Sequence, residues 1–482
     1  MIGQIKPFNL VTDYLITKLQ ISEDAKYEVL EISANELIKA NRLDLIAKYM
    51  YILFKEQDIR SNFATEVYTK HLEAFSKGSF KEPGNDNKNS LEDYITVFDE
   101  MIDDIKFYGF DERISYIPVG NDMGILDGAH RVSSAAYFNQ TVKAVKFRDI
   151  PSSNYNYEYF RNALLDEKYL DFMVQNYCKL KKDIYVACLW PSAASQSKRD
   201  QAFELIKKTS KVIYWKNINL TYNGLRNLMI QIYGHQDWIG NYSNHYSGVN
   251  RKVDYCYGEG KFTIIILEND DFEIILKLKE DIRNIFKLDK HSIHITDTDR
   301  EAAQVVDLLL NENSVNHLNN GLPDKYPNTI KDILKIKSKN EHTESVIMCP
   351  NATLAVYGIE DVGGIFQMDK SLSSDEITKI TQKYDFLYDT NNFFVYDELK
   401  FMSLPIALEY SDIDSDKKKH MIEKYITRDH ALRNKRLLKN RIKITIRKKT
   451  AKIYDFFIIF LKKVGLFEMA RKIYKSIRRE SI

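Results

Sequence analysis

The chain has 482 residues, enough for two to four domains with cores of their own. Hydrophobic residues make up 44% and charged residues 29%, an ordinary globular composition. The four cysteines are scattered without a Cys-x-x-Cys pair, which argues against a zinc site or a disulfide framework and suits a reducing cytoplasm.

The formal net charge of +2 hides an uneven distribution. Residues 428–482 hold 18 Lys and Arg against 4 Asp and Glu, a balance of +14, so the rest of the chain carries −12. An acidic body disfavours binding to duplex DNA, and we expect nucleic acid not to be a partner. The N-terminus lacks the apolar core of a secretory signal, and the chain has no apolar run long enough to span a membrane.

Residues 1 to about 78 are predicted to be helical, because apolar residues recur at helical spacing. Within 41–55 the residues on one such face are Leu45, Tyr49, Ile52 and Leu53. A polar loop over 80–90 leads into a helix that begins near Leu91, with Ser90 as its N-cap. Short strands over 114–118 and 123–126 and a helix over 129–138 follow.

The segment Asp127-Gly128-Ala129-His130-Arg131 lies between the last predicted strand and that helix. Glycine permits a sharp turn, and a helix N-terminus favours an anion. Arginine adds a planar fork of donors that suits phosphate, and histidine adds a donor or a proton carrier. The arrangement predicts a nucleotide-phosphate site, with a plain β-turn and helix cap as the alternative.

Residues 117–138, with Asp-Gly-Ala-His-Arg before an alanine-rich helix, resemble the ParB/sulfiredoxin superfamily over roughly 90–150. Its members include partition proteins that bind a nucleotide, ATP-using sulfiredoxins and kinases acting on free serine. The resemblance implies that ATP or another nucleotide, with Mg²⁺, is bound by Gly128, Ala129, His130, Arg131 and Ser133. Sulfiredoxin chemistry is not expected, because its cysteine precedes the histidine and Ala129 stands there.

The same resemblance implies catalytic roles around the turn. The candidates are Glu82, Asp127 and His130, with Asp127 orienting the turn or Mg²⁺ and Glu82 accepting the acceptor's proton. Asp99 and Glu100 are rivals of Glu82 for that last role.

Residues 180–322 alternate between strand and helix patterns, which is typical of an α/β block. Strands are predicted at 183–190, 210–215, 262–268 and 291–296, and helices at 271–286 and 301–310. The run 262–268 is almost continuously apolar, as expected of a buried central strand.

This block offers a second candidate site. His235 and Asp237 are acid/base candidates in an aromatic segment, which a loop after a helix C-terminus would explain equally well. His294, Thr296 and Asp297 stand where a strand feeds a helix, the usual ligand edge of an α/β sheet. A helix cap at Thr298 or Asp297 is the alternative, and we expect no metal bound by protein side chains alone.

Two further segments complete the chain. Fragments within 343–427 faintly resemble nucleotidyltransferase-like domains, but the stretch 362–366 lacks the Asp-x-Asp pair that such domains use for Mg²⁺. The tail, 428–482, surrounds an apolar centre with Lys and Arg. It is predicted either to lie on an anionic membrane surface or to form a solvated or partner-bound helix.

Together these patterns predict a multidomain protein of the α/β and α+β classes. Its parts are a helical region with a ParB/sulfiredoxin-like domain (1–150), a middle α/β domain (180–322), a small degenerate nucleotidyltransferase-like domain (343–427) and a basic helical tail (428–482).

The predicted function is a kinase-like, nucleotide-dependent phosphotransferase acting on a hydroxyl of a small molecule or sugar. The added α/β blocks, the aromatic-rich composition and the tail favour a glycan acceptor in bacterial surface-polysaccharide biosynthesis. The expected location is the cytoplasm, peripheral to the inner face of the membrane. The alternatives are a ParB-like partition or regulatory protein, which needs a helix-turn-helix after the nucleotide domain, and a non-catalytic nucleotide-binding scaffold.

Overall fold

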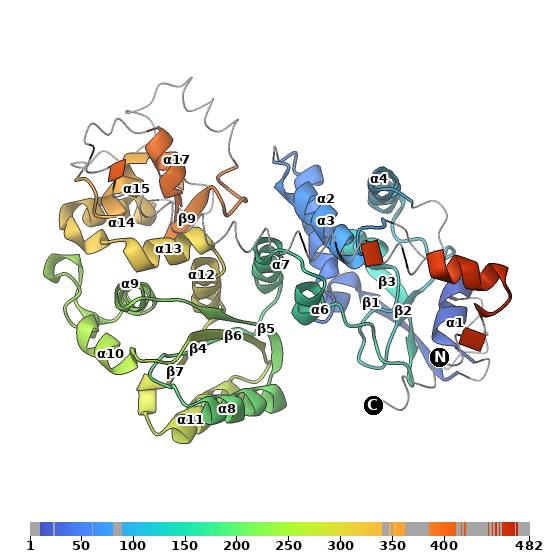
Figure 1. Ribbon diagram of the computed structural model, residues 1–482, viewed down its shortest axis with the longest axis horizontal. Coiled ribbons are helices and arrows are strands. Elements are labelled where there is room, and N and C mark those ends of the chain that lie inside the picture. The colour runs from blue at the N-terminus through green and yellow to red at the C-terminus, as the bar shows by residue number, and fades with distance from the viewer. Residues whose placement is uncertain are drawn as a thin grey trace.

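The computed structural model is a mixed α/β protein whose described part contains three small sheets (Figure 1). The described residues are 10–22, 25–59, 61–80, 89–339, 347–348, 350–361 and 385–410, with short stretches between 416 and 470. Figure 1 shows the N-terminal elements on one side, the middle and C-terminal elements on the other, and α6 (Tyr157–Asn162) and α7 (Glu167–Leu180) between them.

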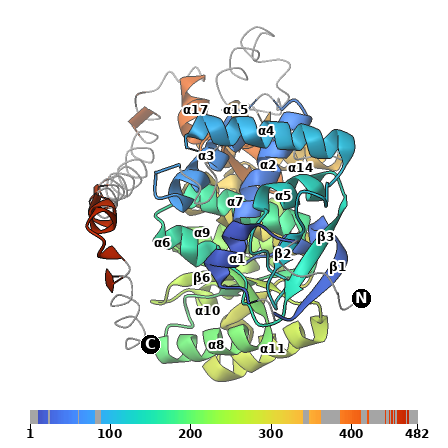
Figure 2. The same cartoon turned by 90° about the vertical axis from the view of Figure 1, so that its right-hand side faces the viewer.

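The N-terminal sheet has the order β1-β3-β2. Its central strand β3 (Thr141–Phe147) runs antiparallel to β1 (Tyr27–Ser33) and parallel to β2 (Ile117–Val119). Six helical elements accompany this sheet: α1 (Asp13–Leu19), η2 (Ala34–Leu37), α2 (Asp44–Glu56), α3 (Phe63–Phe75), α4 (Leu91–Tyr108) and α5 (Ala129–Tyr137). Figure 2 shows this side of the molecule, with α4 lying across α2 and α3.

Several predictions for this unit are confirmed. Helix α2 (Asp44–Glu56) covers most of the predicted stretch 41–55. On its predicted face Leu45 and Ile52 are fully buried, and Tyr49 and Leu53 are half-buried. Helix α4 begins at Leu91, and Ser90 caps it reciprocally with Asp93. The all-helical prediction for residues 1–78 is wrong at β1, because pairing with β3, over a hundred residues away, satisfies this segment's backbone in an extended form.

The middle unit has a four-stranded sheet in the order β5-β6-β4-β7, in which every neighbouring pair is antiparallel. Its strands are β4 (Ile184–Leu189), β5 (Lys211–Ile218), β6 (Phe262–Glu268) and β7 (Ile293–Ile295). This order is that of the split β-α-β-β-α-β motif. Strand β6 is central and buried, as its apolar sequence predicts.

Helices cover both faces of this sheet. On one face, α8 (Gln196–Thr209) and α11 (Phe272–Phe286) pack over side chains such as Ala187 and Ile265. The other face is covered by α7, α9 (Tyr222–Tyr233) and α12 (Asp299–Leu309), as Figure 1 shows. Because the strands are antiparallel, the ligand-edge argument for His294 and Thr296, which assumes parallel strands, does not apply.

The connection between β5 and β6 also contains η3 (Asp237–Ile239), η4 (Tyr242–Asn244) and α10 (Val249–Cys256), and η5 (Asp289–His291) precedes β7. The C-terminal unit has a sheet in the order β8-β10-β9. Its elements are α13 (Glu312–Asn320), η6 (Pro323–Lys325), α14 (Pro327–Lys339), β8 (Ile347–Met348), α15 (Pro350–Val356), β9 (Phe393–Tyr396), β10 (Leu399–Met402) and α17 (Leu404–Glu409). The stretch 362–366, where a carboxylate pair is missing from the sequence, lies outside the described residues.

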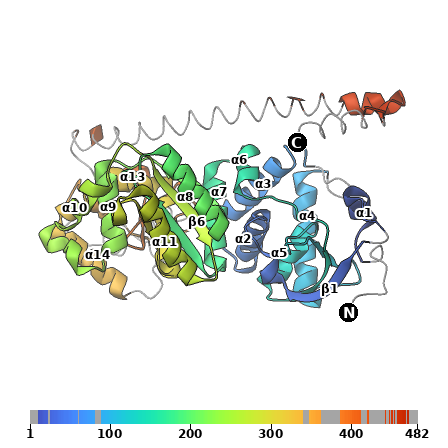
Figure 3. The same cartoon turned by 90° about the horizontal axis from the view of Figure 1, so that it is seen from below.

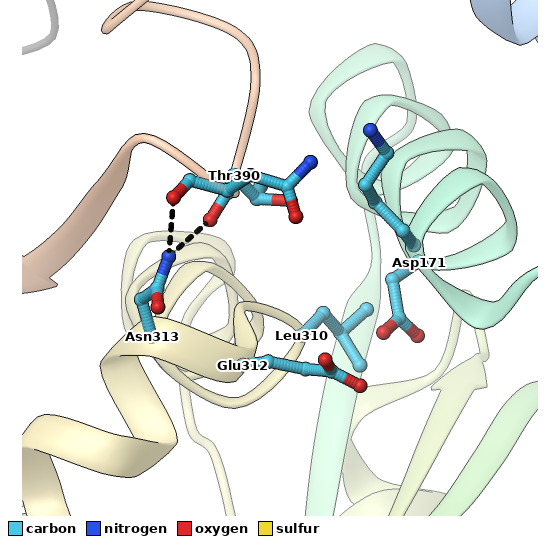
Figure 4. Close-up of a pocket in the computed structure, with 7 residues that line it drawn as sticks. Asp171, Leu310, Glu312, Asn313 and Thr390 are labelled. Carbon is cyan, nitrogen blue, oxygen red and sulfur yellow. Dashed lines mark hydrogen bonds between the residues drawn. The ribbon is translucent and has the colours of Figure 1, made fainter. Parts of the chain in front are cut away.

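Helix α7 joins the units, because it packs against α2 and α3 on one side and α12 on the other. Its Asp171 is buried and accepts hydrogen bonds from the Tyr214 hydroxyl (2.5 Å) and the Lys216 ammonium (2.6 Å). A small pocket beside it is lined by Lys168, Asp171, Leu310, Glu312, Asn313, Thr390 and Asn391 (Figure 4). There Asn313 donates to the carbonyls of Thr390 and Asn391, at 2.8 and 2.9 Å.

Burial raises the pKa of Asp171 to about 6, although the Lys216 charge opposes the shift. The folded protein therefore binds a proton here more tightly than the unfolded chain, whose value is 3.8. The stability that this carboxyl contributes is complete below pH 3.8 and is lost as the pH rises through 6.

We predict that Asp171→Asn removes this dependence, because an amide does not titrate. Thermal unfolding between pH 4 and pH 7 measures this pH dependence of stability. The wild type should lose stability relative to the variant as the pH rises. Parallel pH profiles of the two proteins would contradict the assignment.

Candidate functional site

The Asp-Gly-Ala-His-Arg segment forms the turn between the β2 region and α5. After β2 the chain folds back on itself, with Gly120 donating to the Gly124 carbonyl (2.8 Å) and Leu126 to the Pro118 carbonyl (2.8 Å). Gly128 then takes a left-handed backbone, φ 81°, which favours glycine. A Cβ at this position would lie 3.0 Å from Ile117 Cδ1, so the turn also needs the missing side chain.

The N-terminus of α5 combines features that favour an anion with one carboxylate that opposes it. Within the described part of the chain, no side chain caps α5 and its first turn contains no acidic residue. The preceding Asp127 carboxylate accepts the Gly128 N–H at 2.8 Å. The positive end of the helix dipole therefore faces a turn shaped by glycine.

Arg131 lies against this turn. A Cβ on Gly128 would be 3.3 Å from Arg131 Nη2. Its Nη1 and Nη2 donate to the carbonyl and hydroxyl oxygens of Ser115, both at 2.8 Å, and its guanidinium lies 5.5 Å from the Phe110 ring centroid. Burial lowers the pKa of Arg131, while the charge of Asp127 opposes the shift. Because a guanidinium has five N–H groups, these contacts hold it in place without using all its donors.

His130 points toward helices α3 and α4 and lies among aromatic rings. Its Nε2 shares a hydrogen bond of 3.0 Å with the Tyr68 hydroxyl. The Phe98 ring meets the imidazole edge-on, with centroids 4.6 Å apart, and the Tyr94 ring lies at 6.3 Å. These contacts fix the orientation of the imidazole next to the turn.

Behind the turn lies a buried cluster of charges that the sequence patterns did not reveal. Arg42 binds Asp44 through two hydrogen bonds, at 2.8 and 2.9 Å, and Lys48 approaches the same carboxylate at 3.1 Å. Burial opposes the charge of Asp44, but Arg42 and Lys48 outweigh it and hold the pKa of this carboxyl well below its usual range. The spacing of Asp44 and Lys48, four residues apart on a helix, was the available signal.

The cluster reaches both ends of the Asp-Gly-Ala-His-Arg turn. Arg42 Nη1 donates to the Ile125 carbonyl at 2.6 Å, just before the turn. Lys48 Nζ lies 3.2 Å from His71 Nε2, and His71 Nδ1 lies 2.5 Å from the Tyr68 carbonyl. Burial and the Lys48 charge lower the pKa of His71, so its neutral ring accepts from Lys48 and donates to Tyr68. The Tyr68 hydroxyl then contacts His130.

We predict that Asp44→Ala destabilises the protein by about 3–5 kcal/mol, because it leaves two buried cations without their carboxylate. Glu204→Ala is the matched control. Its carboxylate pairs with Lys207 on the surface, where an ion pair contributes under about 1 kcal/mol. Denaturant unfolding of both variants checks the difference, and equal losses would show that the cluster does not support the fold.

We also predict that Gly128→Ala destabilises the protein by about 1 kcal/mol or more, because alanine is strained at this φ and crowds Ile117. Thermal unfolding of the variant and of the wild type measures the loss, and a variant as stable as the wild type would contradict both the strain and the crowding.

The other residues predicted for this site take different places. Ser133 is fully buried and donates to the Leu45 carbonyl at 3.1 Å, which ties α5 to α2. Asp99 accepts the Tyr51 hydroxyl at 2.9 Å and pairs with Lys55 at 3.0 Å, and Glu100 is exposed. Ala129 is half-buried at the first position of α5. Glu82 lies outside the described residues.

The second candidate site divides into exposed and buried parts. His235 and Asp237 are exposed after α9. By contrast, His294 is buried and pairs with Glu301 at 2.8 Å, and the buried Thr296 hydroxyl accepts the Val186 N–H at 2.9 Å.

Beyond β7, the helix-cap alternative is confirmed. Thr298 caps α12 by accepting the Glu301 N–H at 3.1 Å. Asp297 pairs with Lys279 at 2.8 Å. Helix capping and ion pairing therefore account for the polar residues of this segment.

A search of the described residues finds no group of three or more His, Cys, Asp or Glu placed to hold a metal ion. The same residues include no helix long and apolar enough to cross a membrane. Comparison with protein-family models, with curated proteins and with solved structures gives no match.

Proposed function

We propose that this protein is a nucleotide-dependent phosphotransferase whose phosphate site is the turn at the start of α5. The observation that carries the proposal is the position of the Arg131 guanidinium, beside the left-handed Gly128 and an uncapped helix N-terminus. Backbone, dipole and guanidinium all favour a phosphate at the same place. The resemblance of this segment to the ParB/sulfiredoxin superfamily supports the same ligand.

The site's residues suit phosphoryl transfer, which depends mainly on positioning and charge neutralisation. Arg131 neutralises phosphate charge, and the His130 imidazole is a candidate to hold a proton beside the phosphates. Asp127 would hold Mg²⁺, since this ion commonly binds through one or two carboxylates together with the nucleotide's own phosphates. The metal would supply further neutralisation of phosphate charge.

The proposed acceptor is a hydroxyl of a small molecule or sugar. Exposed aromatic side chains in the middle unit favour a sugar as the acceptor. Each combines an apolar ring with a polar O–H or N–H group. These are Tyr222, Trp238, Tyr255 and Tyr257. We further propose that the reaction serves bacterial surface-polysaccharide synthesis in the cytoplasm, at the inner face of the membrane.

A partition-type DNA-binding function finds less support in the arrangement that follows the nucleotide unit. Helices α6 and α7 come next, but α7 is buried against both neighbouring units. A recognition helix must be exposed to enter the major groove. We therefore do not propose a DNA-binding role.

We predict that ATP with Mg²⁺ raises the melting temperature of the protein and that Arg131→Ala raises the Kd for the nucleotide at least about tenfold. The loss follows from removal of charge-assisted hydrogen bonds to phosphate. Arg113→Ala, which removes an exposed arginine paired with Asp111, is the control and should leave the Kd unchanged. Differential scanning fluorimetry and titration calorimetry measure both effects.

ADP, CTP and GTP are tested in parallel to identify the nucleotide. If none of the four shifts the melting temperature, the proposal fails. ³¹P NMR with the bound nucleotide and a panel of sugars, polyols and serine then tests the reaction. A transferred phosphoryl group supports the phosphotransferase, whereas binding without turnover favours a non-catalytic scaffold.

A further inference from the structure

The tail exposes an unusual density of large apolar side chains. Among the described residues between 442 and 469, ten such side chains are from 46% to 72% exposed: Ile442, Ile446, Ile453, Phe456, Phe457, Ile459, Phe460, Val464, Leu466 and Met469. Residues 456–463 are helical, and Figure 2 and Figure 3 show this helix outside the packed units. Apolar side chains grouped in this way mark an interaction surface.

The sequence arranges these residues as a stripe. Ile442, Ile446, Ile453, Phe457, Phe460 and Val464 follow one another at intervals of three, four or seven residues. This is the spacing of one face of a helix. In the same helical projection the exposed Lys462 and Lys463 fall outside the stripe, whereas Lys449 falls on it.

The charge of the tail indicates what covers the stripe. Residues 428–482 carry a net +14, while the rest of the chain carries −12. A second copy of the tail would place two strongly cationic segments against each other, which costs free energy. An anionic lipid surface instead attracts the basic residues and accepts the apolar side chains at the boundary of its hydrocarbon.

We propose that residues 442–464 bind an anionic membrane surface as an amphipathic helix that lies in the plane of the interface. The apolar side chains of the stripe enter the headgroup and acyl boundary, and the flanking lysines and arginines contact lipid phosphates. The acidic body is repelled by the same surface, so the tail holds the protein while the other units face the solution. This inference does not depend on the proposed phosphotransferase activity.

The test is flotation of the full-length protein with vesicles of phosphatidylcholine alone or mixed with phosphatidylglycerol. We expect binding to the mixed vesicles only, and weaker binding as salt is added. The double variant Phe457→Glu/Phe460→Glu should lower the partition coefficient at least about tenfold, because each change removes an aromatic ring of the stripe that the membrane would bury and adds a repelled charge. Lys462→Glu/Lys463→Glu should also lower it, through charge alone.

The matched control is Ile274→Glu/Leu288→Glu, which replaces two exposed apolar residues of the middle unit, 38% and 39% exposed, and should bind like the wild type. Circular dichroism and thermal unfolding verify that every variant is folded. Absence of binding to anionic vesicles at low salt would overturn the proposal, as would unchanged binding of the phenylalanine variant. A change of oligomeric state in that variant, with no lipid binding by the wild type, would instead assign the stripe to a self-association interface.

Discussion

The buried ion cluster of α2 is the constraint on which the N-terminal unit depends. Arg42, Asp44 and Lys48 are each less than 5% exposed, and taking such charges out of water is costly unless each finds its partners. The cluster meets this requirement by binding backbone just before the candidate turn and by connecting to a side chain within it. Arg42 binds the Ile125 carbonyl before it, and Lys48 reaches His130 through His71 and Tyr68. The geometry of the turn and the satisfaction of the buried charges are therefore coupled.

The same coupling holds the side chains of the candidate site in place. Asp127, His130 and Arg131 are all half-buried at the turn, where Ser115 accepts hydrogen bonds from Arg131 and aromatic rings surround His130. Preorganised donors cost little reorganisation when a charged ligand binds. Helix α7 connects this unit to the middle unit, because it packs against α2 and α3 as well as against α12.

The local patterns of the sequence were sufficient for most helices and for the position of the turn. The capping pair at Ser90 and Asp93, the apolar face of α2 and the Gly-His-Arg spacing are all contained within short segments. Strand β1 could not be predicted in this way, since its partner β3 lies more than a hundred residues away. The antiparallel order of the middle sheet is likewise set by long-range pairing, and it removed the basis for a ligand edge at His294. The role of His71 depends on Lys48 and Tyr68 in three dimensions, so its isolated position in the sequence carried no signal.

A crystal structure of the protein grown with ATP and Mg²⁺ would show whether the turn at the start of α5 binds the phosphates of a nucleotide. We expect phosphate oxygens within hydrogen-bond distance of the Arg131 guanidinium and of backbone N–H groups in the first turn of α5. A nucleotide bound elsewhere on the molecule, with no contact to this turn, would show that the turn is not the phosphate site.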